Sequence, residues 1–65
     1  MKLSLVIKLQ NGAKEPFNLL QTKWVDRLVA QIRLGKSFDV ILDGKSLSSL
    51  EVMTLMHQVL IISKL

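Results

Sequence analysis

The 65-residue chain contains no cysteine and no tyrosine, and it has a single proline and a single histidine. The absence of cysteine excludes disulfides and thiolate metal sites, and His57 alone cannot form a zinc site, so we expect no metal and no other cofactor. No apolar run reaches the ~18 residues of a membrane span, and the amino-terminal segment lacks the cleavage site of a signal peptide. We therefore expect one domain over residues 1–65, in the cytoplasm, with no membrane partner.

Nearly half of the residues are hydrophobic, and the formal net charge is +4. A domain of this size buries only ~60% of the surface of its unfolded chain, so a partner that covers apolar surface would add stability. The basic residues are scattered, and no aromatic side chains alternate with them as base stacking would require. The pattern argues against nucleic-acid binding. A small basic nucleic-acid-binding or phage regulatory protein remains the alternative function.

Apolar periodicity predicts the first half of the fold. Alternation over residues 2–9 predicts a half-buried strand that ends at Asn11-Gly12. From Pro16 the apolar spacing changes to three and four residues, in a stripe widened by Val25 and Val29 that consists of Phe17, Leu20, Trp24, Leu28 and Ile32. This spacing predicts an amphipathic helix of about five turns, with Pro16 at its first position and Gly35 just after its end.

The second half carries stronger local signals. Residues 38–42 alternate as a strand, and Asp43-Gly44 predicts a type I′ hairpin turn into a short strand over residues 45–47. Ser48 and Glu51 have the spacing of a capping box, which predicts a helix through about His57. The tail VLIISKL either forms a strand or continues the helix. The expected class is α+β, in the order β-α-β-β-α, with helices on one face of a small sheet.

Three segments also follow an order and spacing that resemble one family. They are VIKLQNG followed by Pro16, then FDVILDGKSL, then EVMTLMHQ. The family is the histidine-containing phosphocarrier protein (HPr) of the bacterial sugar phosphotransferase system, and the likeness covers residues 3–58. It implies an HPr-like open-faced sandwich. That family's last strand lies between the first two, so residues 59–65 would have to supply it, and its carboxy-terminal helix is missing here.

The resemblance implies a chain that has lost the chemistry of its family. The loop that carries the phosphate-accepting histidine and an assisting arginine is Ala13-Lys14-Glu15-Pro16 here, with neither residue. A lysine ammonium has no free lone pair for phosphorus, and no other catalytic set can be assembled, so no enzyme activity is expected. A weaker prediction is that N–H groups at a helix start, around Gly12, Lys14 and Phe17, bind a small anion.

With phosphate transfer excluded, the resemblance still implies that the chain binds other proteins. In the family, partners dock on the second helix, and the matching residues here are Leu50, Met53, Leu55 and Met56, some of which we expect in the core. We expect a non-catalytic interaction or regulatory protein that binds a protein partner or itself, as a homo-oligomer. Glu51 occupies the position of a serine that a regulatory kinase modifies in some members. It is either a plain helix cap or a permanent mimic of phosphoserine.

Overall fold

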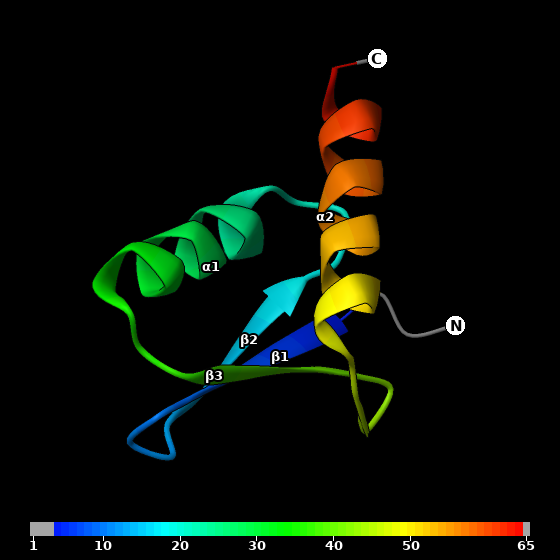
Figure 1. Ribbon diagram of the computed structural model, residues 1–65. Helices are drawn as coiled ribbons and strands as arrows, with labels where there is room; N and C mark the ends of the chain where they lie inside the picture. The colour runs from blue at the N-terminus through cyan, green and yellow to red at the C-terminus, as the bar shows by residue number, and fades with distance from the viewer. Residues whose placement is uncertain (1–3, 65) are drawn as a thin grey trace.

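The computed structural model describes residues 4–64, which form a four-stranded antiparallel sheet and two helices (Figure 1). The elements are β1 (Ser4–Leu9), β2 (Lys14–Asn18), α1 (Lys23–Leu34), β3 (Phe38–Leu42), β4 (Lys45–Ser46) and α2 (Ser49–Ser63). The sheet order is β2-β1-β3-β4, so β1 and β3 pair directly at its centre. The α+β class is confirmed, but the order is β-β-α-β-β-α. The ends of the predicted first strand and of the tail, at residues 2–3 and 65, lie outside the described residues.

The residues after Asn11-Gly12 form a strand, so the predicted helix start at Pro16 is wrong. The Gly12 N–H donates to the Leu9 carbonyl at 2.9 Å, and Gly12 has a φ of 89°, so a short loop closes a hairpin. Strand β2 lies at the edge of the sheet. Alternate backbone nitrogens of an edge strand point away from the sheet, so Pro16 can occupy β2 without removing a ladder hydrogen bond. Burial alternates along β2, with Glu15 and Phe17 on its covered face.

One face of the sheet carries the core. Leu5 and Ile7 of β1 and Val40 of β3 are buried, and the register places Ile7 opposite Val40. Ser4 and Lys8, the alternating neighbours on β1, are exposed, which confirms the predicted period of two. Both helices pack against the buried face and leave the other face of the sheet open (Figure 1).

Helix α1 begins at Lys23 and has 12 residues, so it is shorter than the predicted five turns. Trp24 anchors it: the side chain is fully buried, and its indole N–H donates to the Leu19 carbonyl at 2.9 Å. Gly35, with a φ of 67°, ends the helix as predicted. The buried residues of α1 are Trp24, Val25, Leu28 and Gln31, so the predicted stripe is confirmed at Trp24, Val25 and Leu28, whereas Ile32 is exposed.

The local signals of the second half are confirmed. Asp43 and Gly44 have φ values of 56° and 76°, the geometry of a type I′ turn, although β4 is one residue shorter than predicted. The capping box is complete, because Ser48 and Glu51 each donate a backbone N–H to the other's side chain. Helix α2 then continues to Ser63, so residues 59–63 extend the helix and the strand alternative is wrong for them.

Candidate protein-interaction surface

Helix α2 is apolar around most of its circumference, with a narrow polar stripe of Glu51, Thr54 and Gln58. Its 15 residues include one charged side chain, that of Glu51. Its inner face follows helical spacing, with Val52 and Val59 buried and Leu55 and Met56 partly buried against the core. A helix with so much apolar surface is normally covered on more than one side. Only one side of α2 is covered here, so its other side exposes apolar surface to water.

The exposed side is termed the outer face of α2, and it consists of Leu50, Met53, His57, Leu60 and Ile61. Leu50 is 74% exposed, Met53 66% and Ile61 50%. At 3.6 residues per turn, the five positions fall within an arc of about 100°, opposite the inner face. Figure 1 shows α2 standing at one side of the molecule, with its carboxy-terminal half extending beyond the sheet.

A groove adjoins the outer face of α2. It has a volume of about 480 Å³ and lies between the end of α1, β3 and the first turns of α2. Met53 lines the groove and also belongs to the outer face, and Met56 lies deeper inside. Ile32 of α1, which is exposed, lines the groove as well. The apolar surface therefore continues from the outer face of α2 to the end of α1.

The four residues predicted to bind a partner divide into two pairs. Leu50 and Met53 lie on the outer face, whereas Leu55 and Met56 pack against the core. The exposed side also includes three residues that were not predicted to bind a partner: His57, Leu60 and Ile61. The outer-face residues Met53, His57 and Leu60 follow Leu50 at successive intervals of three, four and three residues. That spacing is visible in the sequence, but the even hydrophobicity of α2 hides which side faces the core.

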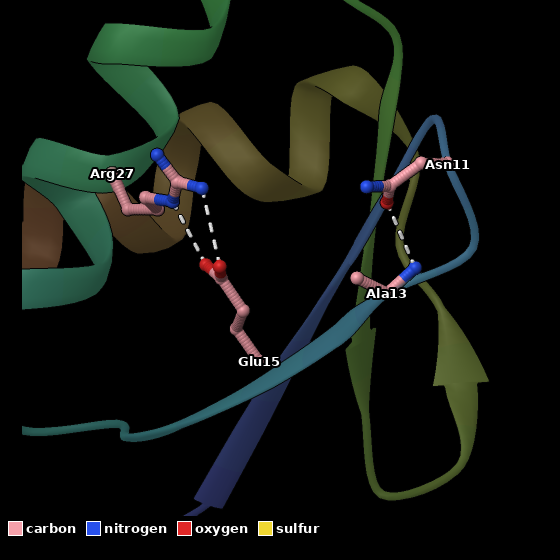
Figure 2. Close-up of polar contacts among 4 residues, drawn as sticks. All are labelled: Asn11, Ala13, Glu15 and Arg27. Carbon is pink, nitrogen blue, oxygen red and sulfur yellow. Dashed lines mark hydrogen bonds and ion pairs between the residues drawn. The ribbon is translucent and has the colours of Figure 1, made fainter.

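The loop predicted to bind an anion uses its N–H groups internally. The Gly12 N–H donates to the Leu9 carbonyl, and the Ala13 N–H donates to Asn11 Oδ1 at 3.0 Å (Figure 2). Lys14 is exposed on β2, and Phe17 packs against the core. The prediction assumed the start of a helix at this place. Because the segment is a hairpin, that assumption is wrong, and no anion site is proposed there.

Glu15 and Arg27 form a two-pronged ion pair that joins the edge strand to α1. Arg27 donates from Nε to Oε1 at 2.8 Å and from Nη2 to Oε2 at 3.1 Å (Figure 2). The hydrogen bond from Arg27 holds the pKa of Glu15 below its ordinary value of 4.5; burial opposes this, and the charge of Arg27 adds to it. The pair fixes the position of α1 over β2, and it neutralises the arginine that borders a small polar pocket with Gln31 and Lys36.

Glu51 acts as a helix cap. Its carboxylate accepts from the Ser48 N–H at 3.0 Å, and its own N–H donates to Ser48 Oγ at 3.3 Å. The hydrogen bonds from Ser48 lower the pKa of Glu51 from 4.5, with a further contribution from the charge of Lys45. The predicted capping role of Glu51 is confirmed. The phosphoserine-mimic interpretation stays a prediction.

No protein-family model, curated protein or solved structure matches this chain. The relation to HPr therefore stays a prediction. Among residues 4–64, no helix is long and apolar enough to cross a membrane. Within the same residues, no three histidine, aspartate or glutamate side chains cluster as metal ligands.

Proposed function

We propose that this protein is a non-catalytic interaction module that binds another protein chain through the outer face of α2 and the adjoining groove. The observation that carries the proposal is the exposure of Leu50 and Met53 on a helix with one charged side chain. Burying a fully exposed side chain of this kind contributes about 1.5–3 kcal/mol. The free energy available from covering the outer face is therefore comparable with the stability of a whole small domain, which is about 3–10 kcal/mol at this length.

Binding fits this site better than catalysis does. His57 is the chain's one histidine, and it lies on an exposed helix face beside the apolar Met53 and Leu60. Thr54, its polar neighbour one turn away, donates its hydroxyl to the Leu50 carbonyl at 2.9 Å. A general base or nucleophile needs a second polar group that orients it, and apolar side chains cannot do this. The absence of histidine from the loop around Lys14 also removes the phosphate acceptor that the HPr resemblance would require.

Nucleic-acid binding has less support. Trp24 is fully buried, and Phe17 and Phe38 pack against the core, so these rings offer no exposed platform for base stacking. Helices α1 and α2 are separated by the β3–β4 hairpin and do not form a helix-turn-helix.

An HPr-like origin and a regulatory role in the cytoplasm belong to the same proposal, supported by the order of the three sequence segments. Two features depart from the arrangement expected for that family. Strand β2 stands where its first helix would begin, and β1 pairs directly with β3. The interaction proposal does not depend on this ancestry, since it is argued from the exposed side chains of α2.

Photo-crosslinking in cells that produce the protein tests the proposal. A photoreactive phenylalanine analogue is placed at Met53 in one variant and at Lys8, exposed on the open face of the sheet, in the control. We expect a discrete protein adduct from position 53 and a much weaker one from position 8. An adduct with any protein, including the same chain, supports the proposal. No adduct from position 53, or equal labelling from both positions, would contradict it.

A further inference from the structure

The outer face of α2 has the spacing of a coiled-coil seam. Leu50, Met53, His57 and Leu60 follow one another at intervals of three, four and three residues, the a-d-a-d pattern of two interlocking helices. Ile61 lies beside this line and widens it. The seam is separate from the inner face, where Val52 and Val59 are buried in the chain's own core. One helix therefore carries two apolar faces, and only one is occupied.

We infer that the outer face of α2 binds the same face of a second copy of this chain, with the two helices antiparallel; this rests on the proposed function. In an antiparallel pair, a positions face d positions. Leu50 then lies opposite Leu60 of the second copy, and Met53 lies opposite His57 of the second copy. Four layers form in this way, two of leucine with leucine and two of methionine with histidine.

The antiparallel direction follows from His57. In a parallel pair each residue meets its own counterpart, so the two imidazoles would face each other inside the seam. In the antiparallel pair each imidazole meets the flexible thioether of Met53, which adapts to an irregular neighbour. The positive end of one helix dipole also lies beside the negative end of the other.

A second copy fits this face better than an unrelated charged partner. The five outer-face side chains carry no carboxylate, lysine or arginine that would select a partner of opposite charge. Their spacing is instead complementary to itself under a two-fold rotation. A helix of 15 residues is about 22 Å long, so the contact falls at the low end of specific interfaces, below about 1,200 Å² in total. We therefore expect an exchangeable dimer in the micromolar range.

Disulfide trapping tests the direction of the pair. The chain contains no cysteine, so every disulfide reports an introduced position. Purified Leu50→Cys and Leu60→Cys variants, one carrying a mass tag, are mixed under mild oxidation. We expect the mixed disulfide to dominate over both symmetric products. Dominance of the symmetric Leu50→Cys product would overturn the antiparallel arrangement, and a statistical mixture of the three would overturn any fixed register.

Sedimentation of the purified protein tests whether the pair forms at all. Met53→Lys buries a charge in the seam and should raise the dissociation constant at least about 100-fold, whereas His57→Leu should lower it about tenfold. Ser4→Lys, exposed on the open face of β1, adds the same charge elsewhere and should change little. Circular dichroism confirms that each variant is folded.

The two proposals fail differently. A wild-type monomer at millimolar concentration overturns the dimer, whatever else is found. If position 53 still crosslinks to a different protein in cells, the interaction function stands with another partner. If the chain is monomeric and position 53 gives no adduct, both proposals are wrong.

Discussion

Trp24 should dominate the stability of the fold. Its side chain is fully buried between α1 and the sheet, and its indole N–H is bonded to the Leu19 carbonyl. Replacing a buried tryptophan by alanine costs about 3–5 kcal/mol, because transfer energy is lost and a cavity remains. A domain of 65 residues is stable by about 3–10 kcal/mol in total. Trp24→Ala should therefore leave the chain close to its unfolding threshold.

Ile32→Ala is the matched control. Ile32 belongs to the same stripe in the sequence, but the structure exposes it at the end of α1. Because alanine favours a helix, this substitution should change the free energy of unfolding by no more than about 0.5 kcal/mol. Guanidinium unfolding followed by circular dichroism, at a low and fixed protein concentration, measures both variants. Equal losses of unfolding free energy for Trp24→Ala and Ile32→Ala would refute the exposed position of Ile32 and with it the observed orientation of α1.

Three further outcomes follow from local geometry. Ser48→Ala removes an acceptor of the capping box and should cost about 0.5–2 kcal/mol of unfolding free energy. Gly12→Ala forces a side chain to a φ of 89° and should cost about 1–2 kcal/mol in the same assay. Folding lowers the pKa values of Glu15 and Glu51 from 4.5. Their contribution to the free energy of unfolding is therefore complete above about pH 4.5 and is lost as the pH falls through their pKa values in the folded state. In an acid titration, the unfolding free energy of Glu15→Gln should fall less steeply with pH than that of the wild type. An unchanged slope would contradict the ion pair with Arg27.

Local signals predicted the second half of the chain well. The Asp43-Gly44 turn and the Ser48–Glu51 capping box depend on a few neighbouring atoms, so they can be recognised without the rest of the fold. The segment between Gly12 and α1 was predicted wrongly because Pro16 suits both a helix start and an edge strand. Only the pairing of β2 with β1, which places Pro16 opposite Val6, decides between the two.

The candidate surface was only partly predictable for a related reason. Leu50, Met53, Leu55 and Met56 are all apolar, and the polar stripe of α2, formed by Glu51, Thr54 and Gln58, is too narrow to decide which of the four faces outward. The orientation of α2 depends on Val52 and Val59 reaching the core, which is a tertiary contact. The length of α2 was also open, because β-branched Ile61 and Ile62 suit a strand, and no residue interrupts the helix before them.

The central claim is that this chain binds through the outer face of α2, with a second copy as its partner. A dilution series of two-dimensional NMR spectra, from millimolar to low micromolar protein, tests this claim most directly. The account predicts concentration-dependent shifts concentrated at Leu50, Met53, His57, Leu60 and Ile61, with the exposed sheet residues Lys8 and Asn18 unchanged. Spectra that do not change on dilution, or shifts confined to the open face of the sheet, would contradict it.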